Sequence, residues 1–436
     1  MVFTTIARNL RELGQPFSFR QRDTFMENIW EMGVSDLLMT SSTALVLPLN
    51  MLYKSGPTMM QWHKAGFWIQ SIFQVVWLSF WITGPFVREW TWTAQVFFTL
   101  HVLVMFMKMH SYAFYNGHLA DTLRKLNELD SPAAKVSERV AYVRYPSSRN
   151  LVEGAEDEPA QGGATGKETK EAVIQLREAL ATELVSASGH ITYPQNLTVS
   201  NYIDYICCPT LCYELEYPRT ETRSYMEIFY KTLAVFGCIF LLTVISDEFI
   251  IPVLDTSAKR LQQQTDWQDG ALIFAETVSW LLFPFMLTFL LVFLVIFEYL
   301  CGAFAEITLF ADRQFYSDWW NSLDWLEFSR EWNIPVHHFF RRHVYTASRN
   351  TMSRPIATCI TFFISALGHE LIMGCITRKF RGYGFVAMML QMPIVLVQRS
   401  PWVRKRSLLN NVLFWCSMIS GLSMVSATRC HLKCKS

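Results

Sequence analysis

The sequence predicts an all-α membrane protein that crosses the bilayer about eight times and carries additional amphipathic helices at the interface. Of its 436 residues, 51% are hydrophobic and only 17% are charged. The apolar residues come in blocks of about 20, the length that an α-helix needs to span the hydrocarbon core. The net charge of +1 offers no basic surface, so we expect no nucleic acid as partner.

The apolar blocks give the membrane segments in order. Most have the length of one crossing: Val34–Tyr53, Gly66–Val87, Thr93–Tyr115, Ile228–Ser246, Pro355–Ile376 and Asn411–Ala427. The run Gly270–Phe310 would be about 60 Å long as one helix, twice the hydrocarbon thickness. It is therefore two spans or one projecting helix, with a kink possible at Pro284. The short block Tyr383–Val397 has basic residues at both ends and is predicted to be re-entrant or tilted.

These blocks divide the chain into four segments. We expect a cytosolic or interfacial segment at 1–33, three membrane helices at 34–115, a hydrophilic loop at 116–225, and a core with the remaining membrane helices at 226–436. The middle of the loop, "EGAEDEPAQGGATGKETKE", has the composition of a mobile chain. Its end, "NYIDYICCPTLCYELEYPRT", is aromatic and is predicted to lie ordered on or in the interface. The stretch Asp247–Gly270 is net acidic, which favours the lumenal side.

The cysteines predict neither disulfides nor a metal site. Ten cysteines lie mostly in or beside apolar segments, as buried thiols do. Cys430, His431 and Cys434 resemble a fragment of a metal site, but the ordinary interpretation is a solvated tail.

A region rich in tryptophan and charge follows the long apolar run. It reads "FAEITLFADRQFYSDWWNSLDWLEFSREWNIPVHHFF" from Phe304 to Phe340. Aromatic residues mixed with charges favour an interfacial amphipathic helix; the alternative is the wall of a polar pocket. Asn333 and His337 are one helical turn apart. Pro335 between them predicts the first turn of a helix that starts there.

His369 lies in the apolar stretch "TFFISALGHELIMGCI" (Thr361–Ile376). A single membrane histidine most often makes a helix–helix hydrogen bond; the alternatives are a conducting path and a catalyst. Burial favours the neutral imidazole, which is the form that a general base requires. Ser365 precedes it by four residues on the same face and could orient the ring. Cys375 lies about 1.7 turns further on and points away.

Several blocks of this sequence resemble a known family. "FYSDWWN" (Phe315–Asn321) resembles the FYxDWWN signature of the sterol and diacylglycerol branch of the membrane-bound O-acyltransferases (MBOAT). "WNIPVHHF" (Trp332–Phe339) is similar to its W-N-x-x-V-H block, and "SALGHE" (Ser365–Glu370) to the block of its histidine. "MKMHSYAFYNG" (Met107–Gly117) and "PTLCYELEYPRT" (Pro209–Thr220) are most similar to fungal sterol O-acyltransferases.

The resemblance implies the MBOAT fold and transfer of a fatty acyl group from acyl-CoA to the 3β-hydroxyl of a sterol. It implies His369 as general base and Asn333 as oxyanion donor. It also implies residues at the substrate sites: Trp332, Ser365, His337, Phe315, Tyr316, Asp318, Trp319, Trp320, Asn321, Lys108 and His110. Acyl-CoA is then a co-substrate and no cofactor or metal is needed.

The resemblance further implies contact with membrane lipid, a homo-oligomer (dimer or tetramer) and the endoplasmic reticulum membrane, where steryl esters would be formed for storage. Relatives usually carry a long N-terminal region and a different final helix, so this chain departs from the pattern at both ends. Four arginines flank the aromatic region and could meet the phosphates of coenzyme A or simply lie at the interface: Arg313, Arg330, Arg341 and Arg342.

Two alternatives remain. Diacylglycerol acylation would use the same catalytic residues. A proton-coupled transporter would use His369 with the membrane glutamates Glu276, Glu298 and Glu306, although no inverted repeat is visible. We expect these glutamates to make interhelical polar contacts.

Overall fold

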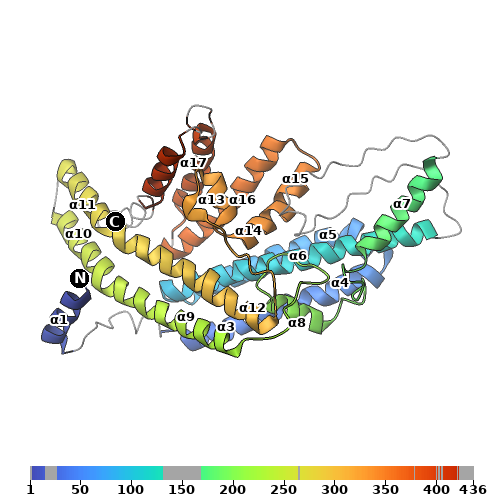
Figure 1. The fold of residues 1–436 in the computed structure, drawn as a ribbon, viewed down its shortest axis with the longest axis horizontal. Helices are drawn as coiled ribbons and strands as arrows, with labels where there is room; N and C mark the ends of the chain where they lie inside the picture. Colours follow the sequence, from blue (N-terminus) through green and yellow to red (C-terminus); the bar gives the residue numbers. More distant parts are fainter. Residues whose placement is uncertain are drawn as a thin grey trace.

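The structure of this chain is a computed structural model (Figure 1). It describes residues 2–14, 27–130, 168–263, 266–377, 379–398, 400, 403, 406–419 and 421. These residues form helices and connecting loops, with no strand among them. Among these described residues, six helical segments are long and apolar enough to cross a membrane, and two shorter apolar helices accompany them. The predicted all-α membrane fold is therefore confirmed.

The N-terminal third forms a bundle around one long helix. A short helix α1 (Val2–Leu13) precedes the first span, which α3 (Ile29–Ser42), η1 (Thr43–Leu45) and α4 (Val46–Ser55) build together. After η2 (Thr58–Met60), the π-helical η3 (Trp62–Gly66) and α5 (Phe67–Val87) form the second span. The third is α6 (Trp92–Asp130), which packs against α3, α4, α5, α7 and α16.

Helix α6 continues well past the predicted end of its span at Tyr115. It extends to Asp130 as one helix, so the first residues of the predicted hydrophilic loop are helical. Helix α7 (Glu168–Glu183) packs along this extension, and Arg177 pairs with Asp130 at 2.6 Å. Most of the acidic stretch that we expect to be mobile, 153–167, lies outside the described residues.

Two very long helical segments form a hairpin (Figure 1). The first contains α9 (Tyr225–Ile245), the π-helical η5 (Ser246–Ile250) and α10 (Ile251–Gln263). The second contains α11 (Trp267–Phe293), the π-helical η6 (Leu294–Leu300) and α12 (Cys301–Thr308). The long apolar run is thus one projecting helix, the second of the two predicted alternatives.

The acidic stretch after Ser246 is largely helical, so the helix continues past the predicted end of its span. The helical backbone continues to Gln263. Glu248 accepts hydrogen bonds from Arg8 (2.8 Å) and Asn9 (2.5 Å) of α1. Hydropathy marks the apolar part of a helix, whereas the helix itself ends where its backbone hydrogen bonds end.

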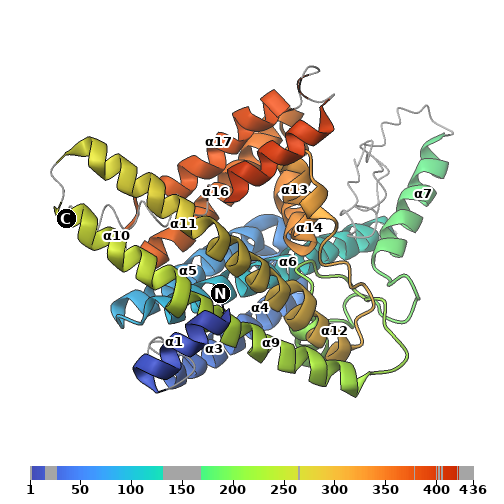
Figure 2. The same cartoon turned by 60° about the vertical axis from the view of Figure 1, so that its left-hand side comes forward.

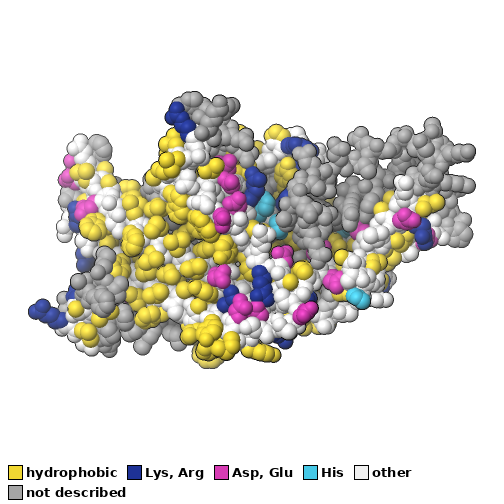
Figure 3. Space-filling model, viewed as in Figure 1, with side chains coloured by type: hydrophobic (Ala, Val, Ile, Leu, Met, Phe, Trp, Pro, Cys, Tyr) yellow, Lys and Arg dark blue, Asp and Glu magenta, His cyan; other side chains and the backbone are white. Residues whose placement is uncertain are grey.

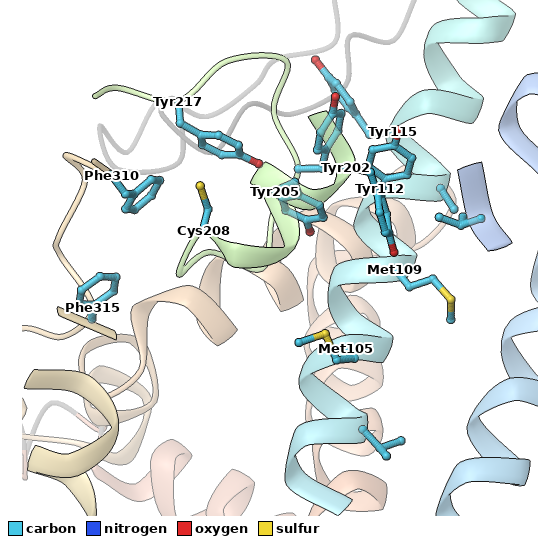
Figure 4. Packing of buried hydrophobic residues seen from close by; sticks show 14 of the residues in the cluster. Met105, Met109, Tyr112, Tyr115, Tyr202, Tyr205, Cys208, Tyr217, Phe310 and Phe315 are labelled. Atoms are coloured by element: carbon cyan, nitrogen blue, oxygen red, sulfur yellow. The ribbon is translucent and has the colours of Figure 1, made fainter. Parts of the chain in front are cut away.

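The aromatic stretch before the hairpin packs inside the protein. Helix α8 (Val199–Cys207) and the loop after it place Tyr202, Tyr205, Tyr213 and Tyr217 in the core against α6. Figure 4 shows Tyr202 and Tyr205 of α8 close to Tyr112 and Tyr115 of α6. The end of the loop is ordered, as predicted. Its rings form a buried cluster, whereas we expected them at the membrane interface.

The C-terminal part carries the motifs of interest. It contains η7 (Trp319–Asn321), α13 (Trp325–Glu331), α14 (Ile334–Phe339), the π-helical η8 (Phe340–Thr346), α15 (Ala347–Arg349), α16 (Arg354–Thr377) and α17 (Tyr383–Gln398). A further apolar helix covers Ser407–Ile419, so part of the predicted span Asn411–Ala427 lies outside the described residues. Helices α16 and α17 lie side by side (Figure 2).

Hydrophobic side chains cover a broad face of the hairpin (Figure 3). Phe229, Phe236, Trp280 and Phe283 are each about 60% exposed or more. In water such a face would be unstable, because exposed apolar area of this size is costly. A lipid environment removes the cost, which agrees with a protein that crosses the membrane several times.

Candidate active site

Two motif blocks are joined through their backbones. The N–H of Ile334 donates to the carbonyl of Phe315 at 3.0 Å, and the N–H of Ser317 donates to the carbonyl of Glu331 at 2.8 Å. The "FYSDWWN" loop therefore lies against the "WNIPVHHF" block, with Asn333 between these two bonds. The two signatures form one local structure.

A cluster of rings supports this structure. Trp319 is 1% exposed and packs against Phe289 and Phe293. Trp332 stacks on Phe328, with centroids 5.6 Å apart and planes at 14°. Buried ring pairs of this kind stabilise a loop beyond their area burial. The expectation of one interfacial amphipathic helix is wrong here, because short helices and loops pack these rings inward.

Other residues of the "FYSDWWN" block have different surroundings. Phe315 is buried, and the hydroxyl of Tyr316 donates to Glu298 at 3.1 Å. Asp318, Trp320 and Asn321 are exposed. The carbonyl of Trp320 accepts from the amide of Asn411 and the indole of Trp415, residues that attach the C-terminal apolar helix to this loop.

Asn333 is the N-cap of α14. Its Oδ1 accepts the N–H of Val336 at 3.2 Å, and Pro335 lies in the first turn, as predicted. Only the oxygen of an amide can accept this bond, so the cap determines which way the amide group points. Among the described residues its NH₂ group has no hydrogen-bond partner. Asn333 therefore presents a donor that is held in place by its own helix.

Three histidines follow Asn333. His337 lies one turn on, since its N–H donates to the carbonyl of Asn333 at 3.0 Å. Burial, and then the nearby His338, lower the pKa of His337 to about 4. Burial also lowers the pKa of His338, and lowers that of His343 well below its usual value. These rings are therefore neutral at pH 7.

His369 lies on an open face of α16. The ring is exposed, and its Nδ1 is 2.8 Å from the carbonyl oxygen of Ser365. A carbonyl can only accept, so Nδ1 carries a hydrogen, and in the neutral ring the lone pair is on Nε2. Ser365 thus orients the ring through its backbone, whereas the sequence suggested its hydroxyl. The Nε2 atom is free to accept a proton.

We expected the imidazole of His369 to be buried, and this is wrong: within the described part of the chain the ring is exposed. Helix α16 packs against α6, α17 and η8, and Cys375 faces α6, where it lies 3.4 Å from the hydroxyl of Thr99. His369 is six residues from Cys375 and so points in another direction. The low amphipathicity of this helix gave no sign of which face would pack.

Asn333 and His369 are connected through η8, the segment that follows α14. Helix α14 continues into η8, and η8 packs against α16. Two cavities of about 230 and 300 Å³ lie elsewhere, one lined by residues of 191–219 and the other by Lys54 and the end of α6. The chamber expected between Asn333 and His369 is neither of these and stays a prediction.

Lys108 and His110 lie in α6. The ammonium group of Lys108 is buried and donates to the carbonyls of Tyr205 (3.1 Å) and Cys208 (2.6 Å). It thereby ties α6 to the end of α8, and the structure gives it a packing role. The ring of His110 bonds Gln74 at 2.9 Å and lies edge-on to His343, with centroids 5.1 Å apart.

Sequence reasoning missed the partner of His343. Its Nε2 is 2.9 Å from the hydroxyl of Ser111, which also accepts the N–H of Tyr213. The "HSY" letters within "MKMHSYAFYNG" were the available signal, since they place Ser111 beside His110. The fold then brings both against η8.

One flanking arginine is not placed for coenzyme A. Arg342 is buried, pairs with Glu214 at 2.9 Å and lies over the ring of Tyr115. This corrects the expectation that it could meet phosphates. Arg313 is partly exposed and pairs with Glu306.

The membrane glutamates make polar contacts between elements, as predicted. Glu276 pairs with Arg260 at 2.7 Å and Glu298 with Lys231 at 3.1 Å, both across the long hairpin. Glu306 also accepts the N–H of Ser224 at the start of α9. These pairings join Glu276 and Glu298 across the hairpin and Glu306 to Arg313.

Within the described part of the chain, no three His, Cys, Asp or Glu side chains are placed together to hold a metal ion. Cys430, His431 and Cys434 lie outside it.

Known proteins similar to this chain belong, by their names, to the family that the motifs indicate. The profile of the membrane-bound O-acyltransferase family matches residues 67–428. The probable sterol O-acyltransferase 2 of Schizosaccharomyces pombe is 36% identical over 98% of this chain and 83% of its own length. Sterol O-acyltransferase 2 of Saccharomyces cerevisiae is 33% identical over 91% of this chain, which spans 59% of that protein.

A relative of another branch matches a smaller part. Diacylglycerol O-acyltransferase 1 of Dictyostelium discoideum is 30% identical over 53% of this chain and 37% of its own length.

Proposed function

Since the chain belongs to the membrane-bound O-acyltransferase family, we propose that it transfers a long-chain acyl group from acyl-CoA to the 3β-hydroxyl of a membrane sterol. The observation that supports this most is the free Nε2 of His369 on a membrane helix, fixed by the bond from Nδ1 to Ser365. The similarity of almost the whole chain to proteins named sterol O-acyltransferases supports the sterol as acceptor.

In the proposed reaction His369 is the general base. Its Nε2 takes the proton of the sterol hydroxyl as the oxygen attacks the thioester carbonyl. The tetrahedral intermediate then collapses, the carbon–sulfur bond breaks, and the departing thiolate receives the proton from the imidazolium. No covalent acyl-enzyme is needed. This agrees with the position of Cys375, which is six residues from His369 and points in another direction.

Asn333 is the proposed oxyanion donor. The cap of α14 occupies its Oδ1, so its NH₂ group is oriented without a conformational change during the reaction. A neutral donor that is already oriented stabilises developing negative charge efficiently in a site of low polarity. Trp332 and the "FYSDWWN" loop hold this residue in place and are proposed to border the acyl-CoA and sterol sites.

We further propose that the enzyme lies in the endoplasmic reticulum membrane as a homo-oligomer. The six candidate spans support its place in a membrane. The sterol would reach the site from the bilayer, and the polar headgroup of acyl-CoA would reach it from water. The protein is proposed to work with acyl-CoA as co-substrate and without a further cofactor.

An acceptor assay tests the proposal. Purified protein is given labelled oleoyl-CoA together with ergosterol, cholesterol or diacylglycerol, and the lipid products are separated. The expected result is label in steryl ester. Label in triacylglycerol alone would make the protein a diacylglycerol acyltransferase, and an absence of transfer to any acceptor would overturn acyl transfer altogether.

A further inference from the structure

Glu370, the residue after His369, binds the start of the neighbouring helix. Its Oε1 accepts the N–H groups of Arg381 (3.1 Å) and Gly382 (2.6 Å), and its Oε2 accepts the N–H of Phe385 (3.2 Å). Both oxygens are therefore acceptors, as in a carboxylate. Three backbone donors on one side chain are more than an ordinary surface contact provides.

These donors belong to the N-terminus of α17, which has no cap of its own. The residue before Tyr383 is Gly382, with a φ of +77° and no side chain. An N-cap side chain normally accepts the N–H of the third helical residue, which here is Phe385. Glu370 makes this bond from α16, and the positive end of the helix dipole favours its charge.

Gly384 lies on the other side of this contact. A Cβ atom on Gly384 would lie 3.2 Å from the Oε2 of Glu370 and 3.0 Å from the Cγ of Met373. These distances are shorter than ordinary van der Waals contact, so the side chains of Glu370 and Met373 would have to shift by a few tenths of an ångström to admit another residue. Gly384 thus permits the close approach that Glu370 uses.

We propose that Glu370 is a positioning residue that holds the turn of α16 carrying His369 against the start of α17. The bond from His369 to Ser365 fixes the ring only relative to α16, because both residues belong to that helix. Glu370 fixes that end of α16 relative to its neighbour, and hence the imidazole relative to the rest of the site. The inference rests on the proposed role of His369.

The test compares Glu370→Gln with Glu276→Gln. An amide accepts only at its oxygen, so in Glu370→Gln an NH₂ group faces either Phe385 or the pair Arg381 and Gly382. A displacement of the base by about 1 Å is enough for a large loss of rate. We expect kcat to fall about tenfold or more, with the KM for acyl-CoA within about twofold, per molecule of monodisperse folded protein.

Glu276→Gln is the matched control. It removes a carboxylate of α11 that pairs with Arg260 of α10, and it is expected to keep the parental kcat. Gly384→Ala disturbs the same contact from the other helix and is expected to lower kcat in the same way. The proposal is overturned if Glu370→Gln keeps the parental kcat per folded molecule, whether or not less protein folds. It is also overturned if kcat and KM change in parallel.

A parallel assay of the parent and His369→Ala separates the two proposals. If the parent forms steryl ester, His369→Ala does not, and Glu370→Gln is normal, only the positioning role is wrong. If the parent transfers no acyl group, the proposed function itself is wrong.

Discussion

His369 and Asn333 are both oriented by backbone groups of their own helices. The carbonyl of Ser365 holds the hydrogen on Nδ1 of His369, and the N–H of Val336 occupies Oδ1 of Asn333. Each contact leaves the opposite atom for chemistry: an acceptor on the imidazole and a donor on the amide. An acyl transfer to a hydroxyl needs one of each.

Asn333→Asp separates the two functions of this side chain. A carboxylate keeps an oxygen for the N–H of Val336, so α14 stays capped, but it has no hydrogen to donate and adds negative charge. We expect protein that folds as the parent does and a kcat lower by about 100-fold or more. Steady-state rates with a thermal unfolding curve check this; parental turnover in Asn333→Asp would rule out the donor role.

The histidines near Asn333 predict a pH dependence of stability. An unfolded histidine titrates near pH 6.5, whereas the pKa of His337 in the fold is about 4. Between these values the unfolded chain binds a proton that the folded protein does not, so stability is full above pH 6.5 and decreases as the pH falls toward 4. His337→Gln should make this decrease less steep by up to about 1.4 kcal/mol per pH unit.

Unfolding curves of detergent-solubilised protein between pH 4.5 and 7 measure this slope. His190→Gln, at an exposed position, should leave it unchanged. Equal slopes for His337→Gln and the parent would mean that His337 is accessible to protons in the fold.

At the scale of elements, polar contacts join segments that are far apart in sequence. Lys108 of α6 bonds the end of α8, Glu298 of η6 bonds Lys231 of α9, and the Trp320 loop bonds Asn411. A buried polar group costs free energy unless it is paired. Lys108 is buried, so its two bonds favour the observed arrangement of α6 and α8.

Lys108→Met tests the contact between α6 and α8. The substitution leaves the carbonyls of Tyr205 and Cys208 without their buried donor, at about 1–3 kcal/mol for each unsatisfied group. We expect a lower unfolding temperature and yield, with kcat per folded molecule close to the parent. Lys64→Met, at an exposed position, is the control; a raised KM at unchanged stability would instead place Lys108 at a substrate.

The sequence predicted where the helices lie better than it predicted where they end and which of their sides pack against other helices. Apolar blocks identify spans because lipid requires them. The extensions to Asp130 and Gln263 were missed because polar residues can continue a helix outside lipid, as Glu248 does with Arg8 as its partner. The open face at His369 was missed because a helix that is apolar all round gives no sign of its packed side.

At the scale of the whole molecule, the fold places His369 on a helix that is long and apolar enough to cross a membrane, and the N-cap Asn333 on an adjoining segment. The motif residues were identified by their resemblance to a family. The structure adds that Nδ1 of His369 and Oδ1 of Asn333 are occupied by backbone groups of the described residues. Bonds such as Lys108 to Cys208 or Glu370 to Phe385 could not be predicted, because they depend on helices that meet only in the fold.

The rate of steryl ester formation by His369→Ala, compared with the parent at equal amounts of folded protein, tests the central claim most directly. Loss of the general base is expected to lower the rate by about 100-fold or more, while the unfolding curve stays parental because the exposed ring supports little packing. Turnover within a few-fold of the parent would contradict the claim that Nε2 of His369 accepts the proton.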